Sequence, residues 1–165
     1  MGDVRSAAIW SPNRLKSILH NVGVAAVSAG VALLGLGIDQ LLHIPRSQDR
    51  LVRLVGATSF LIGFLLRVWA AFHFYERNMR VVVLSAQRQL ITTGPFRYSR
   101  NPLYVGGNGF MFIGTSLLVG SPSGVLITLF HLPLVNLMIR REERQLERAF
   151  GDEWRRYERR VRRWF

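Results

Sequence analysis

The chain is built from long uncharged blocks separated by short polar segments. Val22 to Ile38 is 17 residues without a charge, and the 22 residues of 54–75 are interrupted only by Arg67 and His73. A third block, 103–139, runs for 37 residues without a formal charge. Because about 20 apolar residues cross a bilayer as an α-helix, each block has the length of at least one membrane span.

The third block is too long for one crossing, and the run Gly-Ser-Pro-Ser-Gly at 120–124 divides it with a strong turn signal. We therefore predict four spans near 18–42, 54–75, 103–119 and 125–140, the last two forming a helical hairpin. The predicted fold class is an all-α, polytopic membrane helical bundle, one domain over residues 1–165. The alternative, a large soluble helical bundle, requires helices with a polar face, and these blocks offer almost none.

The net charge of +12 does not by itself indicate that this protein binds nucleic acid. A basic soluble domain would indicate nucleic acid, but in a membrane protein positive residues mark the cytoplasmic loops. The N-terminal segment, the 76–102 loop and the C-terminal segment hold 3, 5 and 10 Lys and Arg, against 3 in the 43–53 loop. We therefore expect both termini to be cytoplasmic, with membrane lipids and no nucleic acid as partners.

Metal and thiol chemistry find little support. The chain has no cysteine, which excludes disulfides and thiolate catalysis. Its four histidines are far apart in the sequence and lack the spacing of metal ligands, so we expect no metal.

One polar stretch, "TTGPFRYSRNPLYVGG" at 92–107, leads into the third block and includes its first residues. Its prolines remove backbone donors and fix the local geometry, and its glycines permit close approach or positive φ. The pattern predicts a shaped, non-helical loop that enters a helix with a glycine-lined face. Such a loop can line a ligand pocket or form a tight interhelical connection packed through small residues, and the residues alone do not separate the two.

A second polar stretch, "IRREERQLERAFGDEWRRYERRVRRWF", follows the fourth span. It predicts a helix that leaves the membrane and ends near Gly151, and then an amphipathic helix. The apolar face of that second helix would carry Trp154, Tyr157, Val161 and Trp164. Glu142 and Glu143 are about 100° apart around a helix, so we expect one to face inward while the other pairs with an arginine outside. The alternative is a solvated charge run.

Taken together and in this order, the two stretches resemble the isoprenylcysteine carboxyl methyltransferase family and the related membrane phospholipid methyltransferases. The resemblance covers residues 88–165. It implies an integral-membrane methyltransferase that uses S-adenosylmethionine and acts on a lipid-like or amphiphilic acceptor. Asn101 is a variant familiar among bacterial relatives, so we expect a bacterial inner membrane.

The resemblance also implies which residues form the site. The cytoplasmic elements 88–104 and 140–165 would enclose the cofactor, and Glu142 would meet its positive end. With Arg67, Glu142 is our candidate catalytic residue. The residues implied to bind the cofactor are Arg88, Gln89, Leu90, Ile91, Phe96, Arg100, Asn101, Pro102, Leu103, Tyr104, Glu142 and Glu143.

Two departures from the family pattern bear on the acceptor. Asn101 stands where the carboxyl-methylating members have histidine, and Met138 stands where they carry an arginine that would dock a substrate carboxylate. Arg67 is then the remaining cation within a span, and it either lines the pocket or snorkels to the interface. We expect a lipid-like acceptor with an anionic or zwitterionic head group, while the attacking atom stays open between oxygen, nitrogen and sulfur.

Two other functions stay open on the sequence. Sterol-type membrane reductases, which use NADPH, carry a turn similar to Asn101-Pro102-Leu103-Tyr104-Val105-Gly106, although they are usually much longer. A non-enzymatic membrane adaptor could also keep this scaffold.

Overall fold

The structure is a computed structural model that describes residues 12–79, 81 and 89–165. Every regular element among these residues is helical. In order they are α1 (Pro12–Leu41), α2 (Arg50–Glu76), the 3₁₀ turn η1 (Gly94–Arg97), α3 (Pro102–Tyr104), the π-helical η2 (Val105–Met111), α4 (Phe112–Leu118), α5 (Pro122–Phe150) and α6 (Asp152–Arg160). The all-helical prediction is confirmed for this part of the chain.

Three of the helices are long and apolar enough to cross a membrane, namely residues Leu15–Leu41, Arg50–Glu76 and Pro122–Phe150. Less than a third of the apolar window in each is buried inside the protein. Large side chains such as Leu41, Leu51 and Phe130 are 70–79 % exposed. Because this much apolar surface in contact with water would favour aggregation, the molecule is an integral membrane protein rather than a soluble bundle.

The predicted span 103–119 differs in form from the other three. It is a helical run of three short pieces, α3, η2 and α4, with three, seven and seven residues. Together they reach only the lower limit of about 17 residues for a span. The π-helical piece covers the sequence Val-Gly-Gly-Asn-Gly-Phe-Met, and insertions of this kind are common at functional sites.

Glycines let this broken run pack directly on α2. A Cβ on Gly63 would lie 2.4 Å from the carbonyl oxygen of Gly106, and one on Gly114 would lie 2.5 Å from the Phe60 nitrogen. Between α1 and α5, a Cβ on Gly35 would lie 2.4 Å from the Gly124 Cα. Small residues therefore set the helix spacing, as is usual in membranes.

Asp39 fixes the end of α1 to the turn that precedes α5. Its carboxylate accepts hydrogen bonds from the Ser121 hydroxyl at 2.5 Å and from the Ser123 backbone N–H at 3.1 Å. Ser121 in turn caps α5 by accepting from the Gly124 N–H at 3.0 Å. Asp39 is almost completely buried. Its carboxylate lies against the N-terminus of α5, where the helix dipole favours a negative charge.

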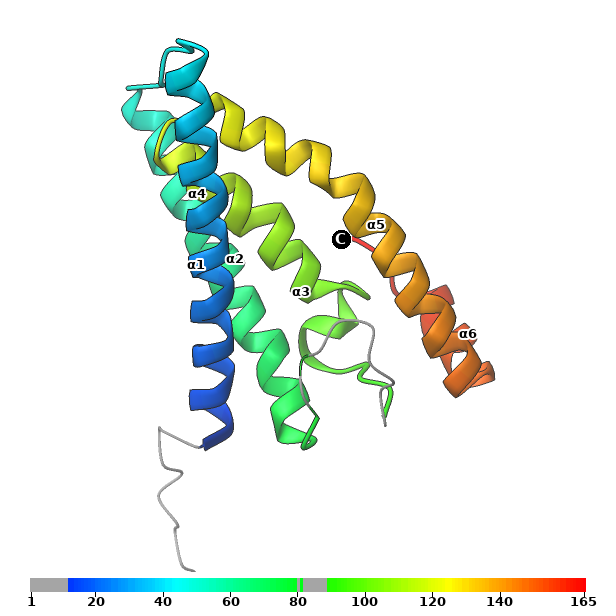
Figure 1. Ribbon diagram of the computed structural model, residues 1–165. Coiled ribbons are helices and arrows are strands. Elements are labelled where there is room, and N and C mark those ends of the chain that lie inside the picture. Colours follow the sequence, from blue (N-terminus) through cyan, green and yellow to red (C-terminus); the bar gives the residue numbers. More distant parts are fainter. Residues whose placement is uncertain (1–11, 80, 82–88) are drawn as a thin grey trace, which may run out of the picture.

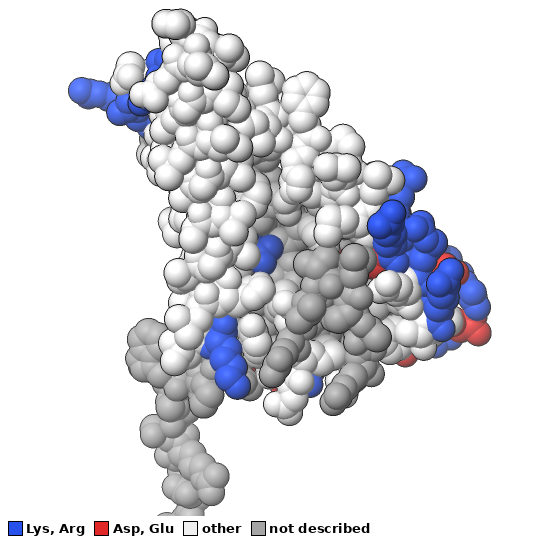
Figure 2. Space-filling model, in the orientation of Figure 1, with Lys and Arg blue, Asp and Glu red and all other residues white. Residues whose placement is uncertain are grey.

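The start of α1, the end of α2, η1 and α6 all lie at one end of the molecule, while α5 leans away from α1 and α2 as it approaches that end (Figure 1). On the face shown, most charged side chains gather at the two ends and leave a largely uncharged band between them (Figure 2). α5 is longer than the predicted span 125–140 and, as predicted, ends just before Gly151. The predicted amphipathic helix is shorter than expected, because α6 ends at Arg160 and leaves Val161 and Trp164 outside it.

Candidate functional site

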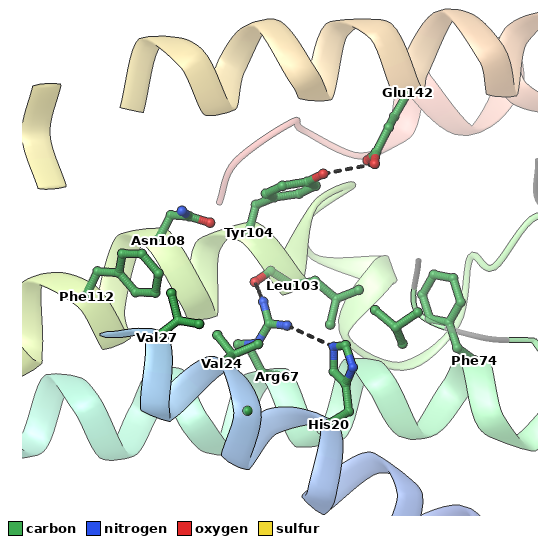
Figure 3. Close-up of a pocket in the computed structure, with 12 residues that line it drawn as sticks. His20, Val24, Val27, Arg67, Phe74, Leu103, Tyr104, Asn108, Phe112 and Glu142 are labelled. Carbon is green, nitrogen blue, oxygen red and sulfur yellow. Dashed lines mark hydrogen bonds between the residues drawn. The ribbon is translucent and has the colours of Figure 1, made fainter. Parts of the chain in front are cut away.

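A cavity of about 440 Å³ lies between the two long N-terminal helices, the 102–118 run and α5 (Figure 3). Volumes of this size are typical of small-molecule sites. Residues from six helical elements, together with Val81 from outside them, line it: His20, Gly23, Val24, Val27, Arg67, Phe74, Val81, Leu103, Tyr104, Asn108, Phe112 and Glu142. Four of them, Arg67, Leu103, Tyr104 and Glu142, are residues that the sequence singled out.

Arg67 is buried in the wall formed by α2, with 7 % of its surface exposed. Its Nε donates to the Asn21 Oδ1 at 2.8 Å, and its Nη1 donates to the Leu103 carbonyl oxygen at 2.5 Å. Its Nη2 lies 3.4 Å from His20 Nε2. No carboxylate lies within salt-bridge distance of the guanidinium in the described part of the chain. Arg67 therefore lines the cavity and does not snorkel to the interface.

The double glycine of the polar stretch makes room for this side chain. A Cβ on Gly107 would lie 2.7 Å from Arg67 Nη1, and one on Gly106 would lie 2.8 Å from Arg67 Cγ. Tyr104 and Asn108, on either side of this pair, line the cavity. The two interpretations of the stretch are thus both realised: its glycines pack against α2, and the residues around them form a pocket wall.

Glu142 enters the cavity from α5, on the other side from Arg67 (Figure 3). The Tyr104 hydroxyl donates to its Oε1 at 2.9 Å. This hydrogen bond joins residues 38 positions apart and fixes the direction of the carboxylate. The cavity consequently has a fixed positive charge on one wall and a fixed negative charge on another.

A comparison with protein-family models identifies one family. The phospholipid methyltransferase model matches residues 51–153, more than half of the chain. The chain belongs to the phospholipid methyltransferase family. No curated protein and no solved structure matches it.

Membership of this family makes the protein a membrane methyltransferase, and it disfavours the reductase and adaptor functions that the sequence left open. The matched range contains Arg67, Leu103, Tyr104 and Glu142. It does not contain α1, which supplies His20 and Asn21 to the cavity and to Arg67. This methyltransferase thus completes its cavity with a helix that lies outside the matched segment.

Arg100, Asn101 and Glu143, which the family resemblance implies as cofactor-binding residues, lie at a junction with the C-terminal segment. The Arg100 N–H donates to the Arg162 carbonyl oxygen at 2.9 Å, and the Ser99 hydroxyl and the Asn101 side-chain amide donate to that of Arg163 at 3.0 and 3.4 Å. We call these residues, together with Trp154 and Glu158, the C-terminal junction.

Charge pairing dominates the C-terminal junction. Arg163 donates two hydrogen bonds to Glu143 Oε2, at 2.5 and 3.0 Å. Arg100 Nη1 lies 3.5 Å from Glu143 Oε1, pairs with Glu158 and stacks on the Trp154 ring at 5.8 Å. Glu143 is only 7 % exposed. As expected, one of the two adjacent carboxylates, that of Glu142, faces inward, and the other, that of Glu143, pairs with an arginine. The difference from the expectation is that the Glu143 carboxylate is buried among protein groups and does not lie outside in solvent.

The other expected cofactor residues lie beside the cavity or away from it. Ile91 and Phe96 belong to a small core with Ala70, Phe74 and Met79, and the Phe96 ring contacts that of Phe74 at 5.8 Å between centroids. Pro102 is buried at the start of α3. Gln89 is exposed, Leu90 is half-buried, and Arg88 lies outside the described residues.

Sequence analysis missed three polar residues of the cavity region, His20, Asn21 and Asn108. Asn21 is fully buried, accepts from Arg67 and donates to the Ser17 carbonyl oxygen at 2.7 Å. A signal for it exists, because Ser17, Asn21 and Ser28 follow helical spacing along an otherwise apolar span. These polar residues mark the face of α1 that turns toward protein.

Glu143→Gln is expected to lower stability by about 2 kcal/mol, because it leaves the Arg163 guanidinium without its buried carboxylate. Limited proteolysis and the thermal unfolding midpoint in detergent would measure this effect. Glu147→Gln is the matched control: it removes an exposed carboxylate of the same helix, which pairs with Arg155 at 3.5 Å and should contribute little. Equal midpoints for both variants would show that the C-terminal junction does not stabilise the fold.

Proposed function

We propose that the protein transfers a methyl group from S-adenosylmethionine to a lipid-like acceptor with an anionic or zwitterionic head group. One observation supports this proposal most: Arg67 and Glu142, which carry opposite charges, line different walls of the same cavity of about 440 Å³. A cofactor with a sulfonium and an ammonium group fits the carboxylate side. An acceptor with a phosphate or carboxylate fits the guanidinium side.

The cofactor side of the cavity consists of Glu142, Tyr104 and Leu103, all residues implied by the family resemblance. S-adenosylmethionine, when bound, supplies a methyl group activated by its attachment to a positive sulfur. The partly buried position of Glu142 strengthens its attraction for such a positive group, because charges interact more strongly where the dielectric constant is lower than in water. Tyr104 orients the carboxylate through its hydroxyl. Phe96 and Ile91 support this wall from the core behind Phe74.

The acceptor side depends on Arg67. A guanidinium has five N–H donors, and the described protein groups engage at most three of them. A buried cation in a membrane span is unfavourable unless it is paired or faces a polar cavity. A phosphate or carboxylate head group would supply the missing charge through a strong hydrogen-bonded pair.

The apolar part of the acceptor has a place of its own beside this cavity. A second cavity of about 330 Å³ lies between η2, α5 and the C-terminal residues, and its lining is almost wholly apolar. Tyr104 and Asn108 line both cavities. We assign the hydrocarbon chain of the acceptor to the second cavity, so that its head group reaches the first past these two residues.

The contribution of the protein to the reaction is positioning and the exclusion of water. Arg67 holds the acceptor head, Glu142 holds the positive end of the cofactor, and the fixed distance between the walls aligns the two reactants. Holding two reactants in line can account for a large part of the acceleration, and an apolar surrounding removes competing water. No metal is required for this step.

The proposal includes four crossings, with the 102–118 run as the third and both termini in the cytoplasm of a bacterial cell. It is supported by the 18-to-3 distribution of Lys and Arg between the two sides. It is also supported by the common position of the start of α1, the end of α2 and α6 at one end of the molecule (Figure 1). The cofactor cavity then opens toward the cytoplasmic side.

The cofactor assignment predicts that the purified protein in detergent binds S-adenosylhomocysteine and does not bind NADPH. Glu142→Gln should weaken the binding at least about tenfold, because it removes one charge-assisted contact. Titration calorimetry measures the affinity, and Glu147→Gln controls for the loss of one carboxylate from α5. Binding of NADPH alone, or equal affinities for both variants, would contradict the assignment.

The acceptor assignment predicts that phosphatidylethanolamine is methylated faster than prenylcysteine analogues or small amphiphilic amines and thiols. Arg67→Met should lower kcat/KM for the lipid on the order of 30-fold, since the head group loses a charge-assisted pair. Transfer of a labelled methyl group measures the rates, and unchanged S-adenosylhomocysteine binding shows that the variant is folded. A prenylcysteine analogue as the best acceptor, together with an unaffected Arg67→Met rate, would refute this assignment.

The topology predicts that reporters fused at residue 1 and at residue 165 both lie in the cytoplasm. Alkaline phosphatase fused at either end should be inactive, and a fluorescent protein that folds only in the cytoplasm should be bright. A fusion in the 43–53 loop, on the opposite side, should show the reverse pattern. Termini on opposite sides of the membrane would mean that the 102–118 run does not cross.

A further inference from the structure

A hollow of about 490 Å³ lies between η1 and α6, away from the methyl-transfer cavity. Among the described residues the two share no lining side chain. Three arginines line the hollow: Arg97 at the end of η1, and Arg156 and Arg160 on α6. Glu153 is the single acidic residue of the lining, so the hollow carries a net positive charge.

The arginines of the hollow differ from their neighbours in having no carboxylate partner. Arg100, Arg155 and Arg163 each form an ion pair. In the described part of the chain, the guanidinium groups of Arg97, Arg156 and Arg160 form neither a hydrogen bond nor an ion pair. Arg156 and Arg160 are one helical turn apart on the same face, where like charges repel each other. The repulsion is relieved when an anion lies between them.

The floor of the hollow is rigid. Tyr157 is 7 % exposed, and its hydroxyl donates to the Phe96 carbonyl oxygen at 2.8 Å. This contact fixes α6 against η1, so that arginines from two elements are held around one space. Guanidinium groups held in this way suit the oxygen atoms of a phosphate group, which they can contact in pairs.

The surroundings of the hollow point to a lipid as the source of that phosphate. α6 begins two residues after the end of α5, a helix long and apolar enough to cross the membrane. Lys and Arg side chains gather over α6 and the adjoining end of α5, next to the largely uncharged band (Figure 2). Basic amphipathic segments directly beside a span attract anionic lipids.

We propose that this hollow is a binding site for the phosphodiester head group of an anionic membrane lipid, with Arg97, Arg156 and Arg160 as the phosphate contacts. The lipid bound here is distinct from the methyl acceptor. Through Tyr157 the hollow contacts Phe96, whose ring packs on Phe74 in the wall of the cavity. Occupancy would therefore hold η1 in the position that closes this wall.

The test is direct binding by the full chain in detergent, which does not depend on the proposed methyl transfer. The probes are short-chain phosphatidylglycerol, short-chain phosphatidylcholine and inorganic phosphate, each titrated at low and high salt. We expect phosphatidylglycerol to bind in a salt-sensitive manner and the other two to bind much more weakly. Inorganic phosphate that bound as tightly as phosphatidylglycerol would overturn the lipid assignment, as would equal binding of both lipids.

Two double variants separate a defined site from general attraction. Arg156→Gln with Arg160→Gln removes two charges from the hollow, whereas Arg148→Gln with Arg159→Gln removes two exposed charges outside its lining. The first should weaken phosphatidylglycerol binding about tenfold, and the second should leave it within about twofold. Equal losses would overturn the proposal, because only total charge would then matter. Thermal midpoints confirm that both variants are folded, and single Arg97→Gln replaces the first variant if it is not.

Discussion

A positive charge inside the apolar band constrains much of this structure. Arg67 is placed by its helix at a depth where an isolated guanidinium is unfavourable, and the surrounding elements are arranged to accommodate it. α1 provides the Asn21 side chain, and the 102–118 run provides the Leu103 carbonyl oxygen. Gly106 and Gly107 leave the space that the side chain occupies. Three segments that are remote in the sequence thus converge on one residue, and the cavity forms where they meet.

The C-terminal junction connects residues that the family resemblance implies as cofactor-binding to the end of the chain. Arg100, Asn101 and Glu143 attach the last residues of the chain to the polar stretch before α3. Asn101 of the junction lies only two residues before Leu103, which lines the cavity, so the junction is close to the cavity wall along the chain. A family motif can therefore combine residues that face a ligand with residues that fix the geometry of those that do.

Much of the fold could be predicted from the sequence, because it depends on block length and turn signals. The uncharged blocks located α1, α2 and α5, and the 120–124 run located the turn before α5. The different surroundings of Glu142 and Glu143 followed from the angle of about 100° between adjacent positions on a helix. Other features could not be derived. The π-helical turn depends on tertiary packing against α2, and the partners of Arg100 lie 43 to 62 residues further along the chain. Local patterns carry no record of such distant contacts.

Asp39 shows what these distant contacts mean for a chain made from one end to the other. Its carboxylate accepts hydrogen bonds from the Ser121 hydroxyl and the Ser123 N–H, which lie 82 and 84 positions later in the chain. While the ribosome is still producing the middle of the protein, α1 has reached the membrane with an acidic group at its far end and no donor to meet it. The hydrogen bonds that fix the end of α1 can therefore form only after residues 121 and 123 have been made. The first helix to be synthesised thus acquires this contact only once the start of α5 exists.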